Sequence, residues 1–139
     1  MAISQAMCTS FKAECLDEQH DLVADTIKIA LYTSSASLGA ATTAYTTSSE
    51  VANGNGYTTG GNTLANKVVS TSGTTAYFDS DDPEWTSASF TARGALIYND
   101  TNSDKAIAVL DFGGDFTVSS GTFRIVFPAA GANAIIRIA

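Results

Sequence analysis

The sequence predicts an all-β fold with a short N-terminal α-helix, arranged as an antiparallel β-sandwich of the jelly-roll type. Segments rich in β-branched and aromatic residues are separated by turn residues roughly every eight to twelve positions, and no helical segments alternate with them. The strongest pair lies at residues 90–99 and 105–112, joined by a polar linker typical of a turn. Because both arms are apolar at nearly every position, we expect this hairpin in the middle of a packed sheet.

Length and charge limit the classes of function. A chain of 139 residues can bury a core of its own, so we expect a single domain over residues 1–139. Seven Lys and Arg residues against fourteen Asp and Glu residues give a formal net charge of −7, which excludes the basic face that nucleic acid requires. With no apolar run of about 18 residues and no secretory signal, we expect no membrane partner and synthesis in a cytoplasm.

The first segment has helical spacing, with apolar residues every four positions at Ile3, Met7, Phe11 and Cys15. This spacing predicts a helix over residues 3–16 that is capped by Ser4 and ends by residue 19. A helix of this length is marginal alone, so we expect its apolar stripe to pack on the sheet or on a neighbouring subunit.

Residues 26–33 alternate between two faces, which predicts a half-buried strand. The next residues, 34–61, are dominated by Ser, Thr, Ala and Gly and predict a long surface loop, in which residues 44–47 are a candidate for a short strand. We expect the loop to lie flat on the sheet because it carries spaced apolar anchors at Leu38, Tyr45, Val51 and Tyr57.

The second half of the chain predicts further short strands. Residues 63–71 and 74–79 flank Ser72-Gly73, a plausible hairpin turn. Gly113-Gly114 predicts another turn, and residues 133–139 predict the last strand. Between them, a clean alternation with Pro128 at its end places side chains inward at Phe123, Ile125 and Phe127 and outward at Thr122 and Arg124.

No catalytic constellation is visible, so we expect no enzyme activity and no catalytic residue. His20, the only histidine, follows the predicted helix in an acidic stretch, and we expect it on the surface rather than in a Ser/His/Asp triad. The glycines of residues 54–61 have no strand before them and no helix after them, unlike a phosphate-binding loop. The densest carboxylate cluster lacks calcium-loop spacing and predicts a solvated turn at Asp79, Asp81, Asp82 and Glu84.

The two cysteines predict neither a disulfide nor a metal site. On a helix, Cys8 and Cys15 would lie about two turns apart, roughly 10 Å, which is too far to bridge. No Cys or His spacing favours zinc. We therefore expect two reduced, packed thiols, no metal and no cofactor.

Four of the seven cations lie inside predicted strands, at Lys28, Arg93, Arg124 and Arg137. Their long side chains would cover apolar surface on an outer face or protect a sheet edge. Alternatively, they would meet carboxylates of a partner. The sequence leaves both interpretations open.

Five stretches resemble a family of small virion proteins from tailed bacteriophages, the capsid cement or decoration proteins of short-tailed phages. They are the opening Met-Ala-Ile-Ser-Gln-Ala-Met-Cys at the start of residues 1–12, Thr-Ile-Lys-Ile-Ala-Leu-Tyr in residues 26–34, Phe-Thr-Ala-Arg-Gly-Ala-Leu-Ile-Tyr-Asn at 90–99, Ala-Val-Leu-Asp-Phe-Gly at 108–113, and Phe-Pro at 127–128. The loop of residues 34–61 is not matched. The resemblance implies a jelly-roll sandwich.

The resemblance also implies a decoration role on the outer surface of the virion. Copies would bind an icosahedral shell built from a major capsid protein of the HK97-like fold and tie neighbouring capsomers together against the pressure of packaged DNA. Many copies act together, so each contact can be modest, and we expect a homodimer, with a trimer as the alternative. Candidate residues for capsid or self contact are Ile3, Met7, Phe11, Leu38, Tyr45, Tyr57, Arg93, Arg124 and Arg137.

The alternative class is a structural module of a phage tail or fibre that binds a receptor or glycan, since β-sandwiches are common there as well. Such a module would present exposed aromatic side chains on one rim. The sequence offers four for this purpose, Tyr45, Tyr57, Tyr77 and Trp85.

Overall fold

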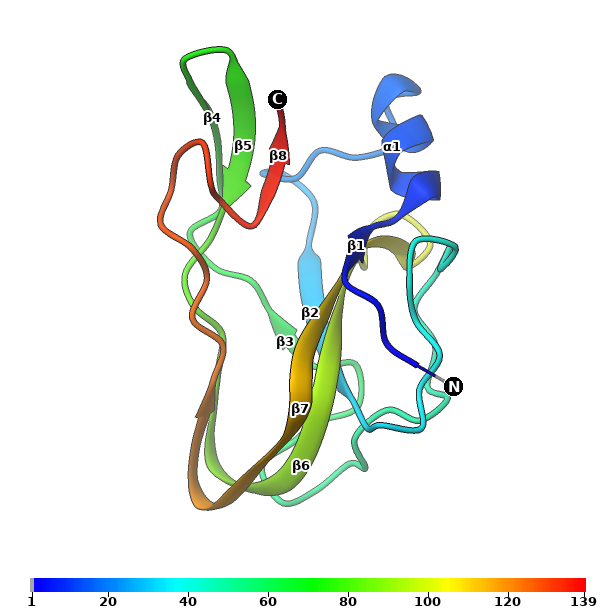
Figure 1. Ribbon diagram of the computed structural model, residues 1–139, viewed down its shortest axis with the longest axis vertical. Coiled ribbons are helices and arrows are strands. Elements are labelled where there is room, and N and C mark those ends of the chain that lie inside the picture. Colours follow the sequence, from blue (N-terminus) through cyan, green and yellow to red (C-terminus); the bar gives the residue numbers. More distant parts are fainter. Residues whose placement is uncertain (1) are drawn as a thin grey trace.

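The structure is a computed structural model that describes residues 2–139, so residue 1 of the predicted N-terminal segment lies outside the described part. It consists mostly of strands with one short helix, as the sequence predicts (Figure 1). A five-stranded antiparallel sheet has the order β1-β7-β6-β2-β3, and a three-stranded antiparallel sheet has the order β4-β5-β8. The elements are β1 (Ala6–Met7), α1 (Thr9–Leu16), β2 (Ile27–Tyr32), β3 (Asn62–Thr63), β4 (Val68–Ser72), β5 (Thr75–Asp79), β6 (Glu84–Asn99), β7 (Lys105–Arg124) and β8 (Ile136–Ile138).

The predicted central hairpin is confirmed as β6 and β7, which lie between β1 and β2 in the larger sheet. Successive side chains of a strand point to opposite faces, yet Ala95, Leu96, Ile97 and Tyr98 are all buried. The sheet is therefore covered on both faces at this level, which explains why the sequence pattern here is apolar without alternation.

The hairpin is longer than predicted, and it bends. Asp111 and Phe116 of β7 lie opposite Gly94 and Ala92 of β6, so residues 112–115 oppose the single residue 93. Gly113-Gly114 is therefore part of a bulge inside one strand and not a turn between two strands, so that prediction was wrong. Extra residues on one strand bend and twist a ladder, and Figure 1 shows the ribbon curving at its lower end so that its distal half runs back up the other side of the molecule.

The predicted helix over residues 3–16 was wrong in its first half. Ala6 and Met7 are extended and pair with Val109 and Ala108 of β7, and α1 begins only at residue 9. Ile3 forms a parallel bridge with Leu38 instead of a helical turn. The edge of β7 offers unpaired backbone groups, and satisfying them with extended residues outweighs the first turns of an isolated helix. Apolar residues four positions apart therefore occur here in two different structures, the edge strand β1 and the helix α1.

Residues 34–61 contain no strand, as predicted, and they lie against the sheet. Leu38, Val51 and Tyr57 are buried, and the half-buried Tyr45 stacks on Tyr98 with ring centroids 4.6 Å apart. The candidate strand at residues 44–47 is reduced to a single bridge between Ala44 and Lys105. These anchors belong to the core of the chain, so the loop is part of the fold rather than an addition to it.

The single strand predicted over residues 63–71 was wrong, because residues 64–67 are not extended into a strand and separate β3 of the larger sheet from β4 of the smaller sheet. The strand predicted as half-buried over residues 26–33 is β2, and all of its residues except Lys28 are buried. Ser72 pairs with Thr75, which places the hairpin turn on Gly73-Thr74, one residue later than predicted. The inward and outward alternation at residues 122–127 is confirmed, although residues 122–124 are the end of β7 and residues 125–127 follow it outside any strand. Within residues 2–139, no helix is long and apolar enough to cross a membrane.

Candidate functional site

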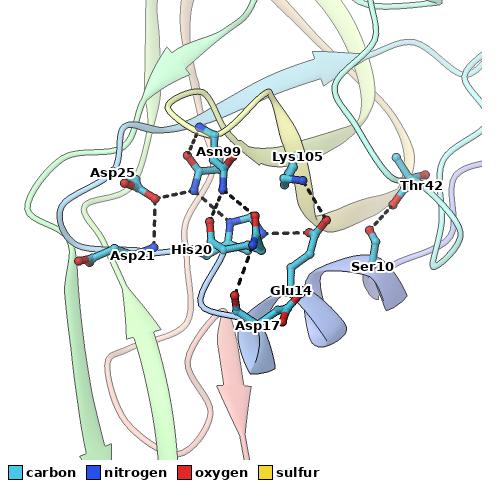
Figure 2. A network of polar contacts seen from close by, with 11 residues as sticks. Ser10, Glu14, Asp17, His20, Asp21, Asp25, Thr42, Asn99 and Lys105 are labelled. Carbon is cyan, nitrogen blue, oxygen red and sulfur yellow. Dashed lines mark hydrogen bonds and ion pairs between the residues drawn. The ribbon is translucent and has the colours of Figure 1, made fainter.

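The histidine is buried, contrary to the prediction of a surface position. Its side chain is 1% exposed and lies against Phe11, with ring centroids 4.9 Å apart. Nε2 donates to a carboxylate oxygen of Glu14 in α1, and Nδ1 faces the side-chain nitrogen of Asn99 at the end of β6, each at 3.0 Å (Figure 2). The chain turns back over the core after α1, and this turn, which has no periodic signature, is what buries His20.

Asn99 fixes the direction of these hydrogen bonds. Its Oδ1 accepts from the backbone N–H groups of Thr101 and Asn102, both at 3.1 Å. Its Nδ2 must therefore donate, and it does so to Asp25 at 2.8 Å and to His20. His20 Nδ1 consequently carries no proton, and Nε2 carries the one that Glu14 accepts. No signal in the sequence distinguished Asn99 from the turn residues that follow it.

This network clamps three segments together. Glu14 also forms an ion pair with Lys105 of β7, with 3.6 Å between the nitrogen and the carboxylate oxygen. The bond from Asn99 lowers the pKa of Asp25, with help from a backbone N–H. Both ring nitrogens of His20 are occupied, so the histidine is not free to serve as a general base. The network joins α1, residues 17–25 and the β6–β7 loop.

A second network surrounds Glu50 in the long loop. Its two oxygens accept from the hydroxyls of Tyr45 at 2.7 Å and Tyr57 at 2.5 Å, and the backbone N–H of Gly60 adds a third donor at 2.8 Å. The Tyr57 hydroxyl also accepts from the backbone N–H of Leu31 in β2, at 3.0 Å. Burial, followed by the Glu50 carboxylate, raises the pKa of both tyrosines. This carboxylate fastens the loop to the sheet.

The two thiols are free, and Asp82 is held by its neighbours. Cys8 is buried and Cys15 is half-buried, both are free, and burial raises the pKa of both thiols, that of Cys8 to about 11. Asp82 accepts from the backbone N–H of Phe127 at 2.9 Å and pairs with Arg124. Among the described residues, no group of three or more His, Cys, Asp and Glu side chains could hold a metal ion.

The predicted contact residues fall into two sets. Four of the six apolar candidates are buried in the core of the chain, namely Ile3, Phe11, Leu38 and Tyr57, while Met7 and Tyr45 are half-buried against it. The three arginines remain at the surface. Arg93 lies 3.6 Å from Asp115, Arg124 lies 3.3 Å from Asp82, and Arg137 donates to its own segment at Ala134. The structure does not bring the nine residues together into one surface.

The four aromatic residues considered for a glycan-binding rim do not form one. Tyr57 and Trp85 are each 2% exposed and stack on each other. Tyr45 stacks on Tyr98. Tyr77 lies in β5 of the smaller sheet. These four residues therefore do not form a contiguous exposed aromatic surface.

Two apolar surfaces remain open, and the sequence did not indicate either. The first, here called the helix–sheet groove, lies between α1, residues 17–25 and the smaller sheet. It has a wide end of about 580 Å³ and a narrow apolar end of about 90 Å³, which share Cys15, Leu22 and Val69. The second, here called the β7 groove, has a volume of about 440 Å³ and is lined mainly by Phe112, Phe116, Val118, Phe123, Ile125 and Val126. These surfaces could bind another macromolecule.

Comparisons with known proteins return no match: no family model, no curated protein and no solved structure is similar to this chain.

Proposed function

We propose that the chain is a capsid cement or decoration protein of a tailed bacteriophage, and that its strands form a jelly-roll-type sandwich. Copies bind the outer surface of an HK97-like icosahedral head and stabilise the contacts between capsomers of the major capsid protein. The protein acts by binding and carries out no chemical reaction.

The observation that carries this proposal is a single row of residues across the larger sheet. Met7 pairs with Ala108, Ala108 with Ile97, and Ile97 with Ile29. Each of the four comes from a different stretch that resembles the phage family. Stretches that are far apart in sequence thus meet in register on four neighbouring strands, which is expected if they resemble one structural framework rather than four unrelated motifs.

The chemistry of the described residues agrees with a binding role. Two side chains of types that commonly catalyse reactions take part in structural hydrogen bonds. His20 bonds to Glu14 and Asn99, and Glu50 accepts from the hydroxyls of Tyr45 and Tyr57. Open apolar grooves lie on the outside of the chain. Many copies acting together make weak single contacts sufficient, and pairing of copies as a homodimer increases this avidity further.

Co-sedimentation with capsid shells of the same phage tests the proposal. The full chain is mixed with mature, expanded shells and with immature shells, and the bound copies per shell are counted. We expect saturable binding near one copy per capsid subunit on mature shells only, and sedimentation equilibrium of the free protein should show a dimer. An unrelated acidic protein of similar size measures non-specific pelleting. Absence of binding to both shells would reject the decoration role.

A further inference from the structure

We propose that the helix–sheet groove is the surface that holds the shell, and that it takes an apolar segment carrying Lys or Arg beside its apolar side chains. The inference rests on the proposed function for the identity of the partner. The kind of segment follows from the chemistry of the groove itself.

The groove exposes apolar side chains that the fold leaves uncovered. Val23, Val69 and Ile138 line it and are 49%, 52% and 59% exposed. Phe11 and Leu22 also line its narrow end. A single exposed apolar residue on a protein surface is ordinary, whereas a contiguous set along a concave surface is typical of an interaction site. Burying these side chains against a partner would supply the apolar part of the binding energy.

The wide end of the groove is acidic. Glu18 and Asp21 line it, and no Lys or Arg of the described chain does. α1 ends beside them without a basic residue in its last turn, so the negative end of the helix dipole adds to the same field. Among the described residues, the only cation lining the narrow end is Arg137, which donates to the Ala134 carbonyl oxygen at 3.1 Å. The unmatched negative charge selects a cationic partner.

The same charge argues against a second copy of the chain in this groove. Two copies related by a two-fold axis would each contribute Glu18 and Asp21 but only one cation, Arg137, so negative charge would remain unpaired between them. The β7 groove lacks a comparable selecting charge, because its cation Arg124 already lies 3.3 Å from Asp82 and 3.8 Å from Glu84. A basic, apolar segment of the shell fits the helix–sheet groove best.

The first test uses peptides and needs no shell. A labelled amphipathic peptide of Leu and Lys, and a counterpart of equal length with Glu in place of Lys, are titrated with the full folded chain by fluorescence anisotropy. We expect binding of the Leu/Lys peptide only, weakened by added salt. Val69→Thr should weaken it at least tenfold, and so should the double variant Glu18→Gln with Asp21→Asn. In the double variant, the amide oxygen introduced at position 21 can still accept the backbone bonds that Asp21 accepts from Val23 and Ala24.

Matched controls lie on the distal part of β7 and just beyond it. Val126→Thr removes an exposed apolar side chain, and Asp115→Asn removes an exposed carboxylate, and neither residue lines the groove. These variants should bind the peptide like the wild type. Equal binding of both peptides, or equal effects of groove and control variants, would overturn the groove assignment. Ile138→Thr repeats the test if Val69→Thr unfolds.

The second test repeats shell co-sedimentation with the same variants, and it separates the two proposals. Loss of binding in the groove variants with retention in the controls supports the groove as the shell contact. If the wild type sediments with shells and the groove variants sediment equally, the groove assignment fails while the decoration role stands. If the wild type does not bind shells at all, the decoration role fails and with it the assignment of the groove to the shell.

Discussion

Asn99 donates a hydrogen bond to Nδ1 of His20 across 3.0 Å, and the two residues are 79 positions apart in the chain. This bond has only one possible direction, because the other end of the amide is held by two backbone N–H groups. It joins the segment after α1 to the end of β6, so the position of the N-terminal helix depends on a polar contact in a buried site.

Replacing Asn99 with Ala should destabilise the protein by about 3 kcal/mol, because buried donors and acceptors would lose their partners at about 1–3 kcal/mol each. Urea unfolding followed by the fluorescence of Trp85, the single tryptophan, measures this change. Asn133→Ala alters an exposed asparagine and should change stability by less than about 0.5 kcal/mol. Equal midpoints for the two variants would contradict the clamp.

Asp104→Asn should stabilise the protein at neutral pH. Burial, followed by the nearby Asp100, raises the pKa of Asp104. A carboxyl group with a raised folded pKa costs stability wherever it is ionised, and that cost disappears as the pH falls below the ordinary value of about 3.9. The variant should gain roughly 0.5 kcal/mol at pH 7, and the gain should vanish in acid. The residue has a φ of 55°, a conformation that Asn tolerates. A gain that persists at low pH would exclude this cause.

The tyrosines should resist ionisation until the protein unfolds in base. Burial raises the pKa of Tyr32, Tyr45, Tyr57 and Tyr98. In the unfolded chain they ionise near pH 10, so the stability that the neutral phenols contribute is lost as the pH rises past that value. The phenolate absorbance of these four should appear in one cooperative step together with the change in circular dichroism. Gradual ionisation of a folded protein would contradict the burial of these rings.

Two glycines with nearly the same φ angle should differ greatly when replaced by Ala. Gly61 has a φ of 78°, and an added Cβ would fall 1.8 Å from the Ile29 carbonyl oxygen; Gly113 has a φ of 79° and no atom within 4 Å. Gly113→Ala should cost only the left-handed penalty of about 1–2 kcal/mol. Gly61→Ala should exceed about 4 kcal/mol, because β2 must move. Thermal melts compare the two, and similar losses would exclude close packing of the loop on β2.

Local patterns predicted the parts of the fold that depend on neighbours in sequence. The alternation at residues 26–33 predicted β2, and the β-branched and aromatic residues on both sides of the polar turn at residues 99–105 predicted the central hairpin. Met7 was misplaced because a spacing of four suited both a helix and a strand at the edge of β7. The glycines at positions 113 and 114 favour a bulge as readily as a turn.

The site was harder to predict because its parts are distant in sequence. Burial of His20 depends on Asn99 and Phe11, and the helix–sheet groove depends on β8 lying beside β5 and near α1. The sequence around His20 or Val69 contains no pattern that indicates these spatial neighbours. The acidic residues near His20, Glu18 and Asp21, do line the wide end of the groove. The side chain of His20 is nevertheless buried.

The irregular ladder of β7 limits how its outer edge can pair with another strand. Beyond Asp111, the outer edge of β7 pairs with no described strand, and an unpaired edge invites strand addition and aggregation. The bulge at residues 112–115 and the left-handed Ser120, with a φ of 49°, break that edge into short pieces that cannot align with a straight strand. The irregular edge thus hinders strand addition without a lysine on it.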